Sequence, residues 1–325
     1  MLEVRDEPDP EPAGSQVRIR VRAAGVNFAD LMARVGLYPD APKPPCVVGY
    51  EVAGVVDAVG PEVTGVAPGD RVMAMPHFGG YTDTLVVDAS LVYPMPAEMS
   101  FEHGAALPVA YLTAHHMMLG TGHLRPGSRV LVHSAAGGVG LAAIQIARTR
   151  DCEIVGVASA AKHEALRAMG VAHTIDSAGR DHARAVRAIV GDRGVDLILD
   201  PVGGASWSAG YDLLAPAGRL VAFGFSAAMP GQRRSLTRAA TQLLRVRRFS
   251  PMRLMSDNRT ISGVNMGHLF GETRLLTDQV RSLVEMYRAG QIAPHVARTF
   301  SFDQAPAAHR HLHSRAAIGK VLLVP

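Results

Sequence analysis

The chain has 325 residues, of which 48% are hydrophobic and 19% are charged, so it is long enough to build two domains with separate cores. Its formal net charge is only +4, and its basic residues are spread along the sequence, which argues against a nucleic-acid-binding protein. The two cysteines, Cys46 and Cys152, form neither a CxxC pair nor a cluster with histidines, and this usage fits a reduced, cytoplasmic compartment.

The first hundred residues are predicted to be rich in β-strands. Residues Val17–Val21 alternate apolar and charged side chains, as a half-exposed strand does. Asn27–Val35 has the pattern of a short helix. Further strands are predicted at Glu51–Gly60, Arg71–Met75 and Tyr81–Val87.

From about Phe101 onwards, the pattern changes to alternating strands and helices. The predicted strands are Arg129–His133, Glu153–Ala158, His173–Asp176, Val195–Asp200, Gly218–Phe223 and Thr260–Val264. The predicted helices between them are Gly138–Arg148, Ala161–Met169, His182–Val190 and Ser206–Leu214. This alternation predicts an α/β domain with a doubly wound parallel sheet of the Rossmann type, which binds a dinucleotide across the carboxyl ends of its strands.

The last fifty residues are predicted to hold two helices and a closing strand. Leu275–Ala289 has a long helical pattern, and Ser301 with Gln304 has the spacing of a capping box that begins a helix ending near His313. We expect Lys320–Val324 to be a strand that returns to the first domain.

A glycine-rich turn between the first predicted Rossmann strand and its helix is the strongest functional motif. Its glycines allow a tight turn and a close approach of the backbone to a diphosphate, and the N-terminus of the helix offers unbonded N–H groups. The residues that we expect to bind a dinucleotide here are Ala136, Gly137, Gly138, Val139 and Gly140.

The end of the second Rossmann strand predicts which dinucleotide binds. NAD-selective sites place a carboxylate there to bind the ribose hydroxyls. In this chain Ser159 and Lys162 follow the strand, and its only acid, Glu153, is at the start. A hydroxyl and an ammonium suit a 2′-phosphate, so we expect NADPH; a solvated lysine in the first turn of a helix is the alternative.

Several short motifs together resemble the medium-chain dehydrogenase/reductase superfamily, within it the quinone oxidoreductase branch, and most closely its vesicle amine transport protein subgroup. The motifs are Ala24-Gly-Val-Asn27-Phe-Ala-Asp30, Gly36-Leu-Tyr38-Pro39, Gly49-Tyr-Glu51-Val-Ala-Gly54, Gly69-Asp-Arg71-Val72, Asp200-Pro-Val-Gly-Gly204, Ile261-Ser-Gly-Val-Asn-Met-Gly267 and Gly319-Lys-Val-Leu-Leu323.

The resemblance implies a β-rich GroES-like catalytic domain joined to the Rossmann domain. We expect residues 1–106 and 289–325 to form the catalytic domain, and residues 107–288 the NADPH-binding domain. Relatives also pair through the last Rossmann strand, here Thr260–Val264, so a homodimer is expected.

Two features depart from these relatives. They usually begin with a strand that this sequence lacks, so the first hairpin is expected to be incomplete or the start misassigned. Ser177 stands where a tyrosine often contacts the adenosine phosphate, so that contact is not expected.

Zinc binding is not expected. Asn27 and Tyr50 stand where zinc-dependent members of the superfamily have a cysteine and a histidine as ligands, and an amide and a phenol bind zinc poorly. His309 and His313 would share one face of a helix, but no third ligand is evident, and we interpret them as a solvated histidine face.

The resemblance also assigns residues to the nicotinamide and the acceptor. Gly224 and Phe225 should border the nicotinamide ribose, and Val264, Asn265 and Met266 its amide, while Thr113 should face the diphosphate or nicotinamide; each of these residues could instead serve packing.

Asn27 and Tyr38 match positions that face the nicotinamide in quinone oxidoreductases. The Asn27 amide could donate a hydrogen bond to a developing oxyanion, and Tyr38 could orient the substrate or donate a proton. A helix cap at Asn27 and a turn tyrosine at Tyr38 are the structural alternatives.

These features predict an NADPH-dependent, zinc-independent reductase of quinones or related activated carbonyl compounds. One alternative is a reductase of enoyl thioesters or 2-alkenals, which uses the same hydride chemistry. Another is an NADPH-binding protein of low turnover that acts through partner or membrane contacts, suggested by the arginine-rich segment 233–248. We prefer to interpret that segment as an exposed helix, and we expect neither a secretion signal nor a membrane-spanning helix.

Overall fold

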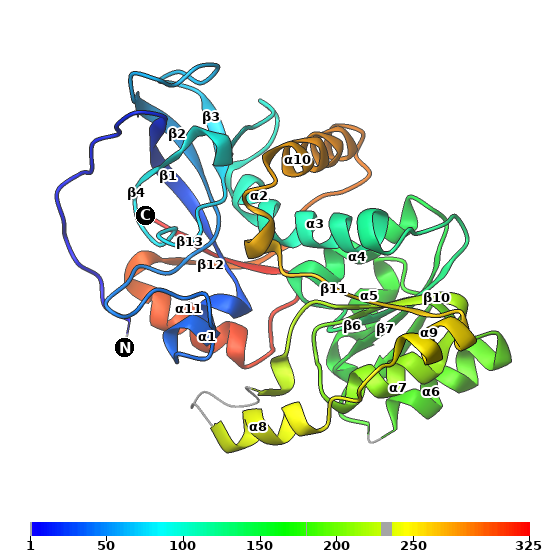
Figure 1. Ribbon diagram of the computed structural model, residues 1–325. Coiled ribbons are helices and arrows are strands. Elements are labelled where there is room, and N and C mark those ends of the chain that lie inside the picture. The colour runs from blue at the N-terminus through cyan, green and yellow to red at the C-terminus, as the bar shows by residue number, and fades with distance from the viewer. Residues whose placement is uncertain (1, 180, 229–235) are drawn as a thin grey trace. The chain divides into compact units, whose positions relative to one another are not determined.

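The computed structural model describes residues 2–179, 181–228 and 236–325 (Figure 1). The chain forms two compact units. The discontinuous unit combines Met1–Leu112 with Met266–Pro325, and the continuous unit is Thr113–Asn265.

A seven-stranded sheet forms the framework of the discontinuous unit. Six strands lie in the order β12-β13-β1-β2-β3-β5, and β4 also pairs with β1. The strands are β1 (Gln16–Val26), β2 (Val52–Val59), β3 (Arg71–Ala74), β4 (Thr84–Asp88), β5 (Val92–Pro94), β12 (Val296–Ser301) and β13 (Lys320–Val324). The antiparallel pairing of β13 with β1 confirms that the chain returns to its first domain.

The alternating pattern of β1 determines how it packs. Val17, Ile19 and Val21 are at most 2% exposed and belong to the core. Arg18 and Arg20 point to the other face, where their Nε atoms lie 2.9 and 2.7 Å from the Asp57 carboxylate of β2. One face of the strand therefore supplies the hydrophobic burial, and the other supplies cross-strand ion pairs.

The helices of this unit are short except for one. They are α1 (Phe28–Arg34), α2 (Phe101–Ala106), α10 (Thr273–Arg288) and α11 (Ala305–His313), while α3 (Pro108–His115) crosses the boundary between the units. The predicted capping box is present, because the Ser301 N–H donates to Gln304 Oε1 at 3.4 Å. A 3-10 turn at Phe302–Gln304 separates this cap from α11.

The continuous unit contains a six-stranded parallel sheet in the order β11-β10-β9-β6-β7-β8, which confirms the Rossmann-type prediction. Its strands are β6 (Arg129–His133), β7 (Glu153–Ala158), β8 (His173–Asp176), β9 (Val195–Asp200), β10 (Leu214–Ala222) and β11 (Thr260–Gly263). Its helices are α4 (Gly138–Arg148), α5 (His163–Ala168), α6 (His182–Val190), α7 (Ala205–Leu213), α8 (Leu236–Leu244) and α9 (Pro251–Asp257).

Two predicted elements in this unit begin at positions that were wrong by more than one residue. Strand β10 begins at Leu214, four residues before the predicted start at Gly218. Leu214 already pairs with Val195, ahead of a register shift in the ladder. The helix predicted from Ala161 is instead a 3-10 turn at Ala160–Lys162 followed by α5.

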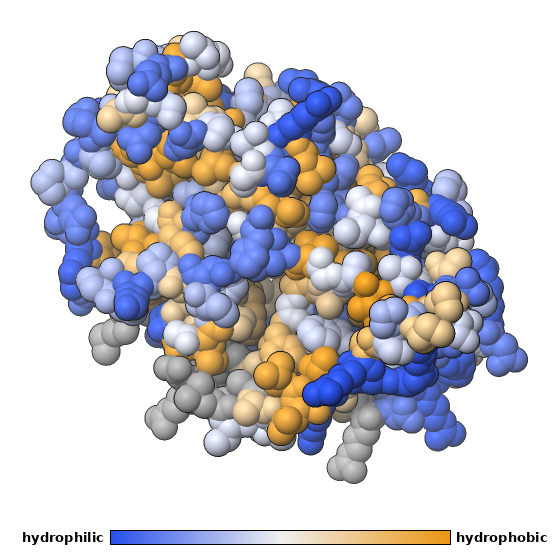
Figure 2. Space-filling view, viewed as in Figure 1, coloured by the Kyte–Doolittle hydropathy of each residue, from blue (hydrophilic) through white to orange (hydrophobic). Residues whose placement is uncertain are grey.

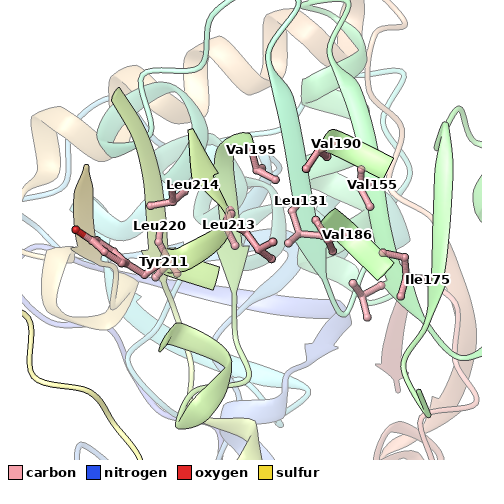
Figure 3. Close-up of a cluster of buried hydrophobic side chains, with 12 residues drawn as sticks. Leu131, Val155, Ile175, Val186, Val190, Val195, Tyr211, Leu213, Leu214 and Leu220 are labelled. Carbon is pink, nitrogen blue, oxygen red and sulfur yellow. The ribbon is translucent and has the colours of Figure 1, made fainter. Parts of the chain in front are cut away.

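Figure 3 shows the core on one face of this sheet. Leu131, Val155 and Leu220 come from three strands and are fully buried, and Val186 of α6 and Tyr211 of α7 close over them. The Tyr211 hydroxyl donates a hydrogen bond to Asp257 Oδ2 at 2.8 Å, so its aromatic ring is buried while its polar end is satisfied.

Exposed apolar side chains are concentrated on α8 and α9. Leu243, Leu244, Met252 and Met255 are 66%, 87%, 71% and 66% exposed, and hydrophobic surface is visible around the end of α8 (Figure 2). Residues 233–235 of the arginine-rich segment lie outside the described residues. Among the described residues, no helix combines the length and apolar character needed to cross a membrane.

The core of the continuous unit makes a direct stability prediction. Leu131→Ala should lower the free energy of unfolding by about 2–5 kcal/mol, because it leaves a cavity among fixed neighbours. The control Leu244→Ala removes an exposed side chain and should change it by less than about 0.5 kcal/mol. Urea denaturation followed by the fluorescence of Trp207, the only tryptophan of the chain, measures both. Equal effects of the two substitutions would contradict the assignment of Leu131 to the core.

Candidate functional site

The glycine turn of the continuous unit connects β6 to α4 at the carboxyl edge of the sheet. Ser134 has a φ of 54°, and the Gly137 N–H donates to its carbonyl oxygen at 2.9 Å. A Cβ on Gly140 would lie 2.5 Å from the carbonyl oxygens of Ser134 and Ala135, so only glycine fits there. The N-terminus of α4 begins at Gly138, whose N–H and those of the next residues lack partners within the helix.

The remaining residues of this turn differ in exposure. Ala136 is 2% exposed, whereas Gly138 and Val139 are half-buried. A ligand at this edge would therefore meet mainly backbone N–H groups, which is the donor set that suits a diphosphate.

The loop after β7 carries the predicted phosphate-binding pair. Ser159 is exposed, and its side chain does not cap the 3-10 turn that follows. Lys162 ends that turn and is half-buried, and no carboxylate occurs between Ser159 and Lys162. With the glycine turn, this loop fits a dinucleotide and offers a hydroxyl and a cation rather than an acid.

Buried Asp200 shapes the neighbouring loop after β9. Its carboxylate accepts hydrogen bonds from the N–H of Val202 at 2.6 Å and the hydroxyl of Ser206 at 2.5 Å. A Cβ on Gly203 would lie only 2.1 Å from the Phe225 ring. Phe225 also packs against Trp207, with 5.6 Å between ring centroids, so packing accounts for at least part of its role.

The other predicted nicotinamide residues lie in two units. Gly224 approaches Pro201 so closely that a Cβ would lie 3.1 Å from its carbonyl oxygen. The Val264 N–H donates to the Ala222 carbonyl at 2.9 Å, which extends the β10–β11 ladder. Thr113, Val264 and Asn265 belong to the continuous unit, and Met266 begins the second part of the discontinuous unit.

In the discontinuous unit, Asn27 is held by a buried ion pair. Lys320 Nζ lies 2.6 Å from Glu51 Oε1, and these residues are 5% and 0% exposed. Asn27 Nδ2 donates to Glu51 Oε1 at 2.9 Å, and Lys320 Nζ donates to Asn27 Oδ1. The Val109 N–H donates to the other Glu51 oxygen at 2.7 Å. The side-chain amide is therefore fixed at both ends, while Asn27 also precedes α1 as its N-cap residue.

This arrangement also bears on metal binding. The Glu51 carboxylate is already neutralised by an ammonium group, and Asn27 and Tyr50 supply an amide and a phenol, so the donor set does not suit zinc. Within the described residues, no three His, Cys, Asp or Glu side chains are placed to hold a metal ion together.

A second buried network of hydrogen bonds connects Asp30 to His309. Asp30 Oδ2 accepts from the Asn27 N–H at 2.8 Å and from the Tyr81 hydroxyl at 3.1 Å, and Oδ1 accepts from the Gly49 N–H at 3.0 Å. The Tyr81 hydroxyl also lies 3.0 Å from His309 Nε2. Burial raises the pKa of Asp30 to about 7, although its three donors oppose the shift.

The prediction of a solvated histidine face was wrong for His309. It is 0% exposed, and burial lowers its pKa to about 3, while His311 and His313 are only half-buried. The Tyr81 hydroxyl pairs with His309 Nε2 across 228 positions in the sequence, whereas the buried Nδ1 has no hydrogen-bond partner among the described residues.

Tyr38 belongs to an aromatic cluster with Tyr50 and Phe78. The Tyr38 and Tyr50 rings meet edge to face with 6.0 Å between centroids, and Tyr50 and Phe78 are 4.8 Å apart. The loop that carries Tyr38 is tied to the turn Met266–Leu269, because His268 Nε2 lies 3.0 Å from Asp40 Oδ2.

Sequence reasoning did not assign roles to Asp30, Glu51, Tyr81 or Lys320. One signal was present for Lys320: it is one of only three lysines, and it begins an otherwise apolar strand that must be buried. A charge in such a strand requires a partner. The sequence alone does not show that Glu51 is this partner.

Comparisons with known proteins show which proteins this chain is similar to. Family models described as "Alcohol dehydrogenase GroES-like domain" and "Zinc-binding dehydrogenase" match residues 13–97 and 169–323. The chain is 41% identical to a zebrafish (Danio rerio) synaptic vesicle membrane protein VAT-1 homolog over 97% of its own length and 65% of that protein. It is 40% identical to the human VAT-1 homolog over 100% of its length and 82% of that protein.

Solved structures show the same fold. Escherichia coli quinone oxidoreductase complexed with NADPH is 29% identical, with a TM-score of 0.86 over 99% of this chain and 95% of that one. The CurK enoyl reductase is 26% identical, with a TM-score of 0.84 over 98% of this chain and 94% of that one.

Asp30 makes a pH-dependent stability prediction. Its pKa is near 3.8 when unfolded and about 7 when folded, so the folded state binds the proton more tightly. Proton binding to Asp30 therefore stabilises the folded state fully below about pH 4. This stabilisation, up to about 4 kcal/mol of the free energy of unfolding, is lost as the pH rises to about 7. Asp30→Asn should remove this slope from the free energy of unfolding, measured by urea denaturation and circular dichroism between pH 4 and 8.

The control for this prediction is Asp278→Asn, which changes an exposed carboxylate of the same unit. It should leave the slope unchanged. The same slope in wild type and in Asp30→Asn would show that the buried carboxyl does not titrate in this range.

Proposed function

Because the chain belongs to the zinc-independent medium-chain dehydrogenase/reductase superfamily, in the branch of quinone oxidoreductases and VAT-1 homologues, we propose that it is an NADPH-dependent reductase of quinones and related activated carbonyl compounds. The reaction converts quinone, NADPH and a proton into hydroquinone and NADP⁺. The family consists of oxidoreductases, and NADPH-complexed neighbours support an NAD(P)-type cofactor.

The observation that carries the proposal is the fixed Asn27 amide. Lys320 donates to its oxygen and polarises the amide, which strengthens its N–H groups as donors. Glu51 accepts from Nδ2 at 2.9 Å, and an amide nitrogen has a second N–H. That N–H would stabilise negative charge developing on an acceptor oxygen without ionising and without a metal ion.

The continuous unit would supply all of the proposed cofactor-binding residues except Met266. The nucleotide supplies a hydride to an electron-poor acceptor. The backbone N–H groups of Ala136–Gly140 would bind its diphosphate, Ser159 and Lys162 its 2′-phosphate, and Gly224, Phe225, Val264, Asn265, Met266 and Thr113 its nicotinamide half.

Two alternative functions remain supported by particular observations. The likeness to the CurK enoyl reductase favours an enoyl-thioester or alkenal acceptor, which would use the same Asn27 donor. The exposed Leu243 and Leu244, followed by exposed Arg245 and Arg248, favour a contact role at a partner or membrane surface. Relatives named as synaptic vesicle membrane proteins agree with that second alternative. We propose a homodimer, as the resemblance implies, and a cytoplasmic location, as the cysteine usage suggests.

Cofactor preference is the first test of this proposal. Wild type should bind NADPH more tightly than NADH, and Lys162→Ala should reduce that preference about 10- to 100-fold, because it removes a charge-assisted hydrogen bond to the 2′-phosphate. Calorimetry with both nucleotides measures the ratio. Lys43→Ala, an exposed lysine of the other unit, is the matched control and should retain it. Equal affinity of wild type for both nucleotides would contradict the NADPH assignment.

The acceptor is the second test. Oxidation of NADPH should be faster with 1,4-quinones than with 2-alkenals or an enoyl-CoA.

Tyr38→Phe should lower turnover on the order of 10-fold or more while NADPH affinity stays the same, because it removes an orienting hydroxyl. Wild-type turnover in this variant would exclude the Tyr38 hydroxyl from the reaction. Faster reduction of enoyl-CoA than of any quinone would favour the alternative function.

A further inference from the structure

The Tyr50 hydroxyl is a buried donor that nothing in the described structure uses. Tyr50 is 7% exposed, and its oxygen is buried without a hydrogen-bond partner among the described residues. Burial raises the pKa of Tyr50, and the nearby Tyr38, Asp30 and Asp40 raise it further, so the phenol keeps its proton. Buried polar groups are nearly always paired, so a neutral phenol with an unspent O–H suggests a ligand.

The surroundings of Tyr50 are aromatic. The Phe78 ring lies 4.8 Å from it at 52°, and the Tyr38 ring meets it at 73°. These rings come from three separate loops, and His268 Nε2 lies 3.0 Å from Asp40 Oδ2 on the loop of Tyr38. The aromatic cluster therefore offers ring faces and edges next to a lone hydroxyl, which suits a flat, conjugated molecule with a carbonyl group.

The backbone of Tyr50 is fixed on both sides by the carboxylates that fix Asn27. The preceding Gly49 has a φ of 105° and donates its N–H to Asp30 Oδ1 at 3.0 Å. A Cβ on Gly49 would lie 2.8 Å from the Tyr81 backbone nitrogen, so the chain passes tightly through this point. The following Glu51 accepts from Asn27. One rigid network thus orients both a phenol and an amide donor.

We propose that Tyr50 determines acceptor specificity: its hydroxyl donates a hydrogen bond to a carbonyl oxygen of an aromatic quinone whose ring packs against Tyr38 and Phe78. This role rests on the proposed function and names its substrate class. Tyr50 keeps its proton throughout, and its hydrogen bond strengthens as the carbonyl oxygen gains negative charge. An aliphatic 2-alkenal has a carbonyl group but no ring to pack in the aromatic cluster, so it benefits less.

Kinetics with two phenylalanine variants test this role. Tyr93 is the matched control, because its hydroxyl is also buried without a partner among the described residues and burial raises its pKa to about 12. Tyr50→Phe should lower kcat/KM for 1,4-naphthoquinone about 10- to 100-fold, the range for a lost hydrogen bond to a charged group. The same variant should lower kcat/KM for 2-hexenal by a smaller factor than for 1,4-naphthoquinone, and it should leave NADPH affinity unchanged. Tyr93→Phe should leave all three unchanged.

A measurement without cofactor separates this inference from the proposed function. The carbonyl stretching frequency of 9-fluorenone, an aromatic ketone, should be lower when it is bound to wild type or Tyr93→Phe than when it is bound to Tyr50→Phe. If wild type reduces no quinone but this difference is present, the proposed function fails and the role of Tyr50 in binding stands. If the frequencies are equal, if fluorenone does not bind, or if Tyr50→Phe reduces 1,4-naphthoquinone like wild type, the role of Tyr50 is overturned.

Discussion

The buried ion pair between Glu51 and Lys320 is the constraint on which the discontinuous unit depends. It joins the residue before β2 to the first residue of β13, and Asn27 and the Val109 backbone complete its hydrogen bonds. Removing one partner of such a pair leaves an uncompensated buried charge, which typically costs about 3–5 kcal/mol. The pair also explains why an amide stands at Asn27: one side chain must accept from an ammonium and donate to a carboxylate.

The two units present different chemistry to their ligands. The continuous unit offers backbone N–H groups at the start of α4 and the ammonium of Lys162, which suit phosphates. In the discontinuous unit, burial favours the neutral forms of three side chains: it raises the pKa values of Tyr50 and Tyr81 and lowers that of His309. The charges of the buried Glu51–Lys320 pair cancel each other. In the proposed function, the anionic nucleotide and the uncharged acceptor would therefore bind to separate parts of the chain.

The sequence predicted the parallel sheet well because continuous apolar runs and glycine turns are local signals. Strands β6, β7, β8 and β9 and helices α4 and α6 have the predicted bounds. The sequence did not predict β12, whose exposed and half-buried residues around Arg298 lack a clear alternation. The glycine turn could be predicted for the same reason, because its strand, glycines and helix are contiguous in the sequence.

The discontinuous unit was harder to predict because its polar contacts are long-range. Lys320 and Asn27 are 293 positions apart, and Tyr81 and His309 are 228 apart. The spacing of His309 and His313 gives an amphipathic face, but it does not say whether that face meets water or a buried phenol. Sequence pattern could place Asn27 and Tyr38 near a site, but it could not show the network that orients them.

The position of β13 determines the order in which the protein can fold during synthesis. This strand lies between β12 and β1 within its sheet, yet it follows the whole of the continuous unit in the sequence. The ribosome therefore releases the whole Rossmann-type unit before β13, and until then Ala24–Val26 of β1 lack their β13 partner, while Gln16–Arg20 can already pair with β4. Until Lys320 arrives, Glu51 has no counter-ion, and the nascent chain must keep that carboxylate in water.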